Sequence, residues 1–444
     1  MGFCASQLAS VALPGGNRAA ATTQAENPYA LIDQLARVLT WIENEYVDPV
    51  DRAKLLEGAI EGMVDKLDPH SAYLPPEDYA IFQSDTEGRF GGVGVEVDFG
   101  EDWVTVIAPI EGSPAERAGV RPGDRIVAID HASVRGKSPA ELVRRMRGEA
   151  GSKVLLTISR KGSEKYLHFV LMREVINVSS VASKSLVGNV GYLRIKAFQV
   201  GTHAELLEHI AKLRKATRTL PGIVLDLRNN PGGLVNEAAA VADEFLEAGV
   251  VFTTRRRGQV VDEVRAVPGG ALRKEPIVLL VNEYTASSAE LLGAALQENR
   301  RARVVGTPTF GKGSVQTIVD LPGGAGMRLT TLRYYSPLGH AIQAQGIQPD
   351  VRPPGATDDF GVIREKNIEG YLPAEQGASS TTEMPPIDPS AAHPETPAVE
   401  LPREIPVDPR KGNDVALRIA YEMLTASPTP APKAPSVAAP KRTP

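Results

Sequence analysis

The chain has 444 residues, of which 42% are hydrophobic and 23% charged, and its formal net charge is −5. A chain of this length exceeds what one hydrophobic core supports, so two or more domains are expected. Both signs of charge are interspersed without a basic stripe, which argues against nucleic acid as a partner, and no apolar run is long enough to cross a membrane.

Residues 1–27 are expected to be either a disordered N-terminus or the remnant of a secretion signal. The start MGFCASQLASVALPGG is apolar and rich in small residues, but it lacks a basic n-region and a full h-region. Cys4 is the one cysteine, so no internal disulfide and no cysteine metal cluster can form. Lipidation of Cys4 is disfavoured, because Phe3 stands where small residues are normally needed.

Residues 28–87 are predicted to form a helical segment. Apolar residues recur there at helical spacing, which predicts a helix with one wet face: Leu31, Leu35, Val38, Leu39 and Ile42. A second amphipathic stretch, 55–67, precedes the loop LDPHSAYLPPEDY, in which His70 is expected to help fix the loop.

Residues 88–176 change to short strands with glycine-rich turns, which indicates a small β-rich domain. From 177 to 355 apolar strands alternate with helices, as in a layered α/β domain with a covered sheet. Residues 356–444 are rich in Pro, Ala, Thr and Ser and are not expected to bury a core, apart from a short helix near 412–425. The chain is therefore expected to be a multidomain α/β protein.

The β-rich region resembles a PDZ domain in FGGVGVEV and in SPAERAGVRPGDRIVAID. Gly91, Gly92 and Gly94 would let backbone N–H groups converge on the terminal carboxylate of a peptide, and the adjoining strand would pair with the incoming tail. The expected peptide-binding residues are Gly92, Val93, Gly94 and Val95. Taken without the second motif, the glycines would indicate only a tight hairpin.

A helix beginning after Ser138 is expected to form the other wall of this groove. Pro139 at the first helical position and Glu141 at the third complete a capping box with Ser138. Leu142, Val143 and Met146 would face the groove or the core.

Three stretches of the α/β region resemble the signature segments of carboxyl-terminal processing, or tail-specific, serine proteases: LDLRNNPGGL, VNEYTASSAE and PTFGKGSVQ. The resemblance spans roughly residues 60–355 and implies a crotonase-like or ClpP-like core. It implies that Ser287 is the nucleophile, that Lys312 is its general base, and that Gln316 acts together with them. It also implies an oxyanion hole formed by the N–H groups of Gly233 and Ser288.

Elementary chemistry agrees with these assignments. Lysine can replace histidine as a base if burial lowers its pKa, and Lys312 lies between two glycines beside Phe310. A serine that opens a helix places developing negative charge at the positive end of the helix dipole. Gln316 would lie about 13 Å from Lys312 on an ideal strand, so their contact requires a bend or bulge.

Simpler interpretations exist for two of these features. Ser287 and Glu290 form an S-x-x-E capping box, which by itself indicates an ordinary helix cap. Arg147 matches an arginine of the family for which a link between the PDZ domain and the active site is one interpretation, and a solvated surface arginine is the preferred interpretation. Tyr284, Thr285 and Ala289 depart from the family pattern.

Two other functions are compatible with parts of the sequence. Residues 306–313 read G-x-x-x-x-G-K-G, close to a phosphate-binding loop, but Gly313 replaces the magnesium-binding Ser/Thr and a strand is predicted to follow instead of a helix. The second alternative is a catalytically inactive PDZ-containing scaffold.

No metal and no cofactor are predicted, because the histidines lack metal-ligand spacing. The expected substrates are proteins with unstructured apolar C-terminal tails. The resemblance implies a bacterial protease outside the cytoplasm, in the periplasm or cell envelope. A homodimer and a regulatory adaptor are further expected partners.

Overall fold

The structure is a computed structural model that describes residues 29–100, 103–110, 112–163, 165–217, 219–354, 364–375 and 405–426. The expectations for residues 1–27, including Cys4, lie outside these ranges. Within the described ranges, no helix is both long enough and apolar enough to cross a membrane.

The first of two compact units ends at Met63 and consists of helices. Helix α1 (Ala30–Glu45) forms where the apolar spacing predicts it, and α2 (Arg52–Val64) begins with Arg52, which pairs with Glu43 of α1. No residue of α1 is buried, and Leu31 and Trp41 are 77% and 72% exposed. The expected covered face of this helix is therefore exposed in the structure.

In the second unit, the β-rich module is built around an antiparallel sheet in the order β3-β4-β5-β7-β8, with β6 added to β5. The module has its own core, in which Val104, Ile126, Ile129, Leu156 and Ile158 are fully buried. Its strands and helices are β3 (Val95–Phe99), β4 (Val104–Pro109), α4 (Pro114–Arg117), β5 (Arg125–Ile129), β6 (Ala132–Ser133), α5 (Pro139–Met146), β7 (Lys153–Ser159) and β8 (Leu167–Met172).

Helix α5 begins as its capping box predicts. Ser138 Oγ accepts a hydrogen bond from the Glu141 N–H, and Pro139 occupies the first turn. Leu142 and Met146 point into the core of the module, whereas Val143 is half-buried. A two-stranded pair, β2 (Arg89–Gly92) with β9 (Glu174–Asn177), joins the start of the module to its end.

The α/β core contains a five-stranded sheet in the order β10-β11-β12-β15-β16, parallel except for the β10–β11 pair. Every residue of β15 is buried, as its continuous apolar run predicts. The strands and covering helices are β10 (Val181–Ser185), β11 (Gly191–Ile195), α6 (Thr202–Ala216), β12 (Ile223–Asp226), α7 (Val235–Asp243), β15 (Ile277–Val281), α8 (Ser288–Glu298) and β16 (Ala302–Gly306).

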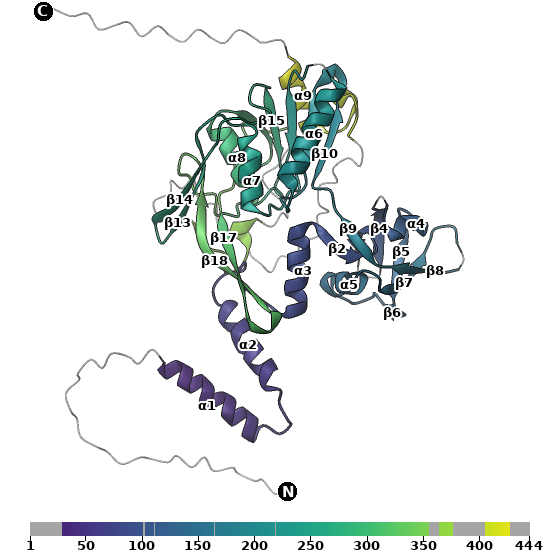
Figure 1. Ribbon diagram of the computed structural model, residues 1–444, viewed down its shortest axis with the longest axis vertical. Coiled ribbons are helices and arrows are strands. Elements are labelled where there is room, and N and C mark those ends of the chain that lie inside the picture. Colours follow the sequence, from purple (N-terminus) through teal and green to yellow (C-terminus); the bar gives the residue numbers. More distant parts are fainter. Residues whose placement is uncertain are drawn as a thin grey trace, which may run out of the picture. The chain divides into compact units, whose positions relative to one another are not determined.

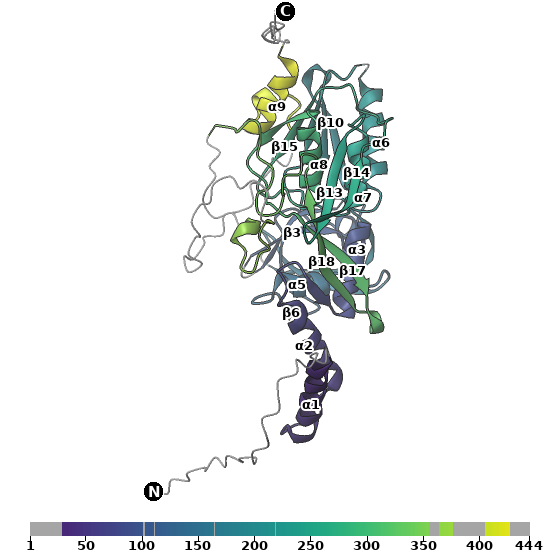
Figure 2. The ribbon, with the colours of Figure 1, turned by 90° about the vertical axis from the view of Figure 1, so that its left-hand side faces the viewer.

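Alternate residues of these strands enter two separate cores. Ile223 and Leu225 of β12 pack with α6, α7 and α8, whereas Val224 packs with the C-terminal helix α9 (Val415–Thr425). Figure 2 shows α9 and α6 on opposite faces of the sheet that contains β15. The fold is thus the layered α/β core, β-rich module and N-terminal helices expected from the sequence (Figure 1).

A second five-stranded sheet packs beside the first and was not predicted. Its order is β1-β18-β13-β14, with β17 also paired to β18. Its strands are β1 (Ala72–Leu74), β13 (Val250–Arg256), β14 (Gln259–Arg265), β17 (Ser314–Asp320) and β18 (Gly326–Tyr335).

Helix α3 (Pro76–Glu87) contacts both the β-rich module and the β17–β18 hairpin. Tyr79 donates to Asp320 at 2.5 Å. Arg147, at the end of α5, pairs with Asp85 at 2.7 Å, and its guanidinium lies 4.3 Å from the centre of the Phe90 ring. The preferred expectation of a solvated surface arginine was therefore wrong, because Arg147 is held between two elements and its side chain is only 20% exposed.

Candidate active site

Ser287 lies at the junction between the loop after β15 and the first turn of α8. Its backbone has φ 56° and ψ −125°, a conformation that costs a non-glycine residue free energy and is retained where the surroundings enforce it. Ser287 is half-buried, so its side chain is not sealed in the core. Such a turn presents a serine at the N-terminus of a helix, where anions are stabilised.

The loop before Ser287 is joined by hydrogen bonds to the turn after β12. Thr285 Oγ1 donates to the Leu227 carbonyl at 2.8 Å, and the Ala286 N–H donates to the Asn230 carbonyl at 2.9 Å. Thr285, one of the departures from the family pattern, therefore fixes this loop.

The turn that contains Gly232 and Gly233 packs directly against Ser287. A Cβ on Gly232 would lie 2.8 Å from Ser287 Cβ, and a Cβ on Gly233 would lie 2.1 Å from the Phe198 carbonyl oxygen. The Gly232 N–H donates to Asn230 Oδ1. Among the described residues, no acceptor is recorded for the N–H groups of Gly233 and Ser288, so these two donors remain free for a ligand.

Lys312 lies in the loop between β16 and β17 and is half-buried. Burial lowers the pKa of its ammonium group below the ordinary lysine value, and the nearby positive charge of Arg328 lowers it further. The carboxylates of Glu365, Asp68 and Glu290 oppose this shift without cancelling it. A lysine in this environment reaches its neutral, basic form at lower pH than a free lysine.

Glu290 joins the serine loop to the lysine loop. One carboxylate oxygen, Oε2, accepts the N–H groups of both Ser287 and Lys312, at 2.8 and 2.9 Å. The other, Oε1, accepts the Gly311 N–H at 2.8 Å and the Thr309 hydroxyl at 2.5 Å. Burial raises the pKa of this fully buried carboxyl to about 7, although the four hydrogen bonds oppose the shift.

From the sequence, Glu290 was expected only to cap a helix. Its S-x-x-E spacing was the available signal, but the bonds from Thr309, Gly311 and Lys312 to its carboxylate could not be predicted from local spacing.

Gln316 lies on β17 next to a β-bulge between Val315 and Gln316, a distortion of the kind its assignment requires. Its Nε2 donates to Ser314 Oγ at 3.0 Å and to Thr330 Oγ1 at 3.2 Å. No contact between Gln316 and Lys312 is recorded among the described residues. The structure therefore brings Gln316 to a neighbouring network and does not join it to Lys312.

Asp68 organises that neighbouring network. Burial alone would raise its pKa, but hydrogen bonds from Ser71, the His70 N–H and Thr330 outweigh burial and hold the pKa below its ordinary value. Asp68 thus carries a negative charge that fixes the start of β1 against β18.

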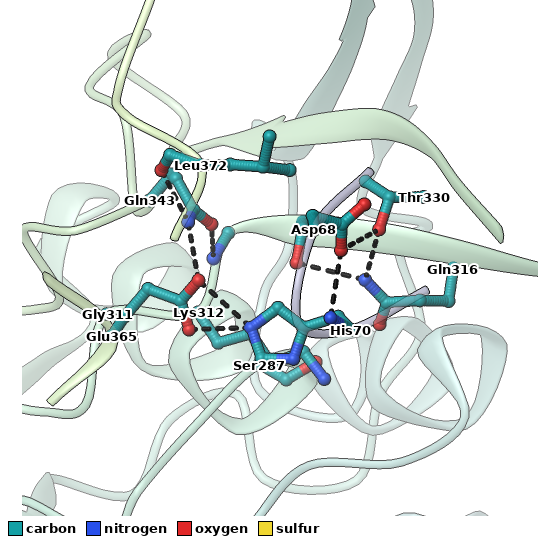
Figure 3. Close-up of polar contacts among 12 residues, drawn as sticks. Asp68, His70, Ser287, Gly311, Lys312, Gln316, Thr330, Gln343, Glu365 and Leu372 are labelled. Carbon is teal, nitrogen blue, oxygen red and sulfur yellow. Dashed lines mark hydrogen bonds and ion pairs between the residues drawn. The ribbon is translucent and has the colours of Figure 1, made fainter. Parts of the chain in front are cut away.

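The C-terminal strap, which we define as residues 364–375, brings a further carboxylate to the site (Figure 3). Glu365 is fully buried, and His70 Nε2 lies 2.7 and 2.9 Å from its two oxygens. Gln343 Nε2 donates to Glu365 at 2.7 Å, while Gln343 Oε1 accepts the Gly313 N–H at 2.8 Å. Composition assigned this strap to a C-terminal region not expected to bury a core, and Glu365 is the one residue of 364–375 that the structure buries.

The expected peptide-binding residues run from Gly92, the last residue of β2, to Val95, the first residue of β3. Among the described residues, β3 pairs only with β4, so its other edge is free to accept a strand. The carbonyl of Val93 accepts the Ala115 N–H, and that of Gly94 accepts the Ile110 N–H and Ser113 Oγ. Gly91 has a different role from the one expected, since a Cβ there would lie 2.1 Å from the carbonyl oxygen of Gly148.

Two further observations concern alternative chemistry. The loop of residues 306–313 leads into strand β17, so the helix that a phosphate-binding loop requires is not present there. In the described part of the chain, no group of three or more His, Cys, Asp or Glu side chains is arranged to hold a metal ion.

Comparison with known proteins gives three family matches. The model of peptidase family S41 matches residues 189–352, a PDZ domain model matches residues 105–160, and a model of the activating protease CtpB N-terminal domain matches residues 8–78.

Individual relatives agree with these matches. A carboxy-terminal-processing protease of Bartonella bacilliformis is 37% identical over 411 residues, which cover 91% of this chain and 90% of that protein. A probable CtpA-like serine protease of Staphylococcus aureus is 38% identical over 72% of this chain and 64% of its own length. A solved photosystem II D1 C-terminal processing protease is 30% identical over 72% of this chain and 86% of its own, with a TM-score of 0.47.

Proposed function

The chain belongs to the carboxy-terminal-processing protease family, peptidase family S41, with a PDZ domain, and from this premise we propose that it is a serine endopeptidase with Ser287 as nucleophile and Lys312 as general base. The observation that carries this proposal is the shared acceptor of the two loops. The backbone N–H groups of Ser287 and Lys312 bind one oxygen of the buried Glu290, which holds the serine and the lysine in one site.

The proposed first step is attack of Ser287 Oγ on the substrate carbonyl carbon. Neutral Lys312 takes the hydroxyl proton and then delivers it to the departing amine, which leaves an ester on Ser287. Water hydrolyses this ester with the same lysine as base. The lowered pKa of Lys312 supports this role, because a larger fraction of the amine is neutral near physiological pH.

The N–H groups of Gly233 and Ser288 are the proposed oxyanion hole. Ser288 follows Ser287 in the chain, Gly233 follows the Gly232 that packs against Ser287, and neither N–H has another acceptor in the described residues. The N-terminal end of α8 adds its dipole.

Gln316 is proposed to orient Lys312 during the reaction. Its amide nitrogen donates to Ser314 and Thr330, while its Oε1 has no partner recorded in the described residues and is available to accept from the lysine. This role requires a rearrangement on substrate binding.

The PDZ domain is proposed to capture apolar C-terminal tails of protein substrates. Support comes from the free edge of β3, the half-buried Val95 and the apolar side chains of α5. The tail would pair with β3, and its carboxylate would bind N–H groups of residues 92–95.

The deciding experiment is cleavage of casein and of a tail-bearing protein by the full chain. The wild type is expected to cleave both, while Ser287→Ala and Lys312→Ala lose cleavage and keep their melting temperatures. Folded wild-type protein that binds tails but cleaves nothing under any condition would instead support an inactive scaffold.

Location and assembly are further proposals. Family membership supports a site outside the cytoplasm, in the periplasm or cell envelope, and the exposed apolar residues of α1 are compatible with a homodimer. An adaptor that regulates the enzyme is a further proposal. Cell fractionation and the mass of the purified protein in solution test the first two.

A further inference from the structure

The C-terminal strap is held at both ends by a glutamate, but only one of these lies at the candidate active site. Glu375 accepts from Tyr335 Oη at 2.7 Å and pairs with Arg333 at 3.2 Å, and both of these partners belong to β18. Glu365, at the other end, is 0% exposed and is bonded to His70 and Gln343. The two glutamates therefore both fix the strap, but only Glu365 does so next to Lys312, which makes Glu375 a matched control.

Glu365 links three loops of the site. His70 belongs to the loop before β1, Gln343 follows β18, and the Glu365 N–H donates to the Phe310 carbonyl at 3.2 Å. Through Gln343, whose Oε1 accepts the Gly313 N–H, the carboxylate also fixes the residue that follows Lys312. Figure 3 shows Glu365 with its hydrogen bonds to His70 and Gln343.

The charges around Lys312 come from several elements. Arg328 of β18 disfavours the ammonium form, whereas Glu365 of the strap, Asp68 of the loop before β1 and Glu290 of α8 favour it. His70 and the Arg328 guanidinium also belong to this cluster, since Arg328 Nε donates to the His70 carbonyl at 2.8 Å. Asp68 and Glu290 each fix other parts of the site, so Glu365 is the carboxylate that the proposed chemistry has not yet used.

We propose that Glu365 is a positioning residue for Lys312. Glu365 holds the lysine loop in place through Gln343, and its negative charge acts on Lys312 during general-base catalysis. The inference rests on the proposed function, because Lys312 must be the base for this charge to affect the rate. It assigns a part in the reaction to a segment that lies beyond the matched protease region of residues 189–352.

The test compares Glu365→Gln with Glu375→Gln in the full chain. Glu365→Gln keeps the shape and removes the charge, so the alkaline rise of kcat/KM should move to lower pH by roughly half a pH unit or more. The direction follows because the carboxylate stabilises the ammonium form, and its removal lets Lys312 lose its proton earlier. Glu375→Gln loosens the same strap without altering this cluster and should leave the pH of the rise unchanged. Glu365→Asp retains the charge and should keep the rise near its wild-type pH.

A second measurement follows the lysine without using proteolysis. Trace labelling with fluorodinitrobenzene, read by mass spectrometry, reports the neutral fraction of Lys312 at each pH. Glu365→Gln should move the labelling curve in the same direction as the activity profile. If Glu365→Gln does not fold, the double variant Glu365→Met/His70→Leu is made instead, because replacing both members of a buried pair by apolar side chains is often neutral for stability, whereas removing one leaves the other uncompensated.

The outcomes separate the two proposals. Lower activity of Glu365→Gln with unshifted activity and labelling curves would reduce Glu365 to a structural contact and overturn the inference. An equal shift in Glu375→Gln would assign the effect to strap packing and would also overturn it. If Ser287→Ala remained active, the proposed function would fail, but the labelling curves would still decide whether Glu365 controls the charge on Lys312.

Discussion

Glu290→Gln tests whether the buried carboxylate both joins the two loops and carries an unusual pKa. The amide oxygen is expected to stay on the side of Ser287 and Lys312, because two backbone N–H groups cannot accept a hydrogen bond. The new NH₂ group then faces Thr309, whose hydroxyl can turn to accept, and Gly311, whose N–H cannot. One charge-assisted hydrogen bond is lost, worth about 1.5–3 kcal/mol.

The effect on stability depends on pH because the folded pKa of Glu290, about 7, lies above the ordinary value of 4.5. A raised pKa contributes stability that is fully present below pH 4.5 and is lost as the pH rises through 7. The difference amounts to about 3 kcal/mol between the two ends of this window. Glutamine has no such dependence, so the stability difference in favour of the wild type should be about 3 kcal/mol larger at pH 4 than at pH 8.

Urea unfolding of both proteins at pH 4, 6 and 8 measures this difference, and peptide cleavage at pH 8 measures activity. If the lost hydrogen bond, worth about 1.5–3 kcal/mol, raises the barrier by a similar amount, kcat/KM should fall about tenfold to a hundredfold, because each 1.4 kcal/mol is a factor of ten in rate. Glu283→Gln, in the same loop but bonded to Thr307, is the matched control. Parallel stability curves for wild type and Glu290→Gln, together with unchanged activity, would refute the reasoning.

The other predictions concern the base, the tail and the last helix. Because burial and Arg328 lower the pKa of Lys312, kcat/KM should rise with pH through a value below that of free lysine; a profile flat from mildly acidic to strongly basic pH would contradict this. A peptide with an apolar free-acid end should bind inactive Ser287→Ala enzyme about ten to a hundred times more tightly than its amide, and titration showing equal affinities would exclude carboxylate capture. Asp414→Asn removes one of two carboxylates bound to the buried Arg228 and should destabilise the chain by about 1–3 kcal/mol in chemical unfolding, whereas Asp408→Asn, whose partner Arg410 is exposed, should change little.

Local patterns in the sequence were sufficient for the layered fold and for the elements that carry Ser287 and Lys312. The apolar run of β15 indicates a strand buried on both faces, and the helical spacing of α6 and α9 indicates helices with one buried face. The second sheet escaped prediction because β1, β13 and β18 pair across long sequence separations. Pairing of that kind leaves no periodic signal in any one segment.

The missed carboxylates have the same cause. Glu290 has a local signal, its capping box, but the partners that give it a further role lie about twenty residues later. Glu365 is 295 residues from His70 and stands in a stretch whose composition indicated no core. Arg147 was assigned to solvent because only the folded chain brings Phe90 and Asp85 around it.

The covering of the central sheet by α9 has a consequence for the order in which the protein can fold. Leu417 and Tyr421 pack on strands that precede them by more than a hundred residues, and Asp414 completes the ion pair of Arg228, close to the Gly232–Gly233 turn. A growing chain that has been synthesised only as far as β17 already contains Ser287 and Lys312, yet one face of its sheet lacks a cover. Closing this long loop is slow relative to forming local helices. The complete core can therefore form only after synthesis has reached α9, which delays completion of the sheet that positions Ser287 and Lys312 until well after both residues have been added to the chain.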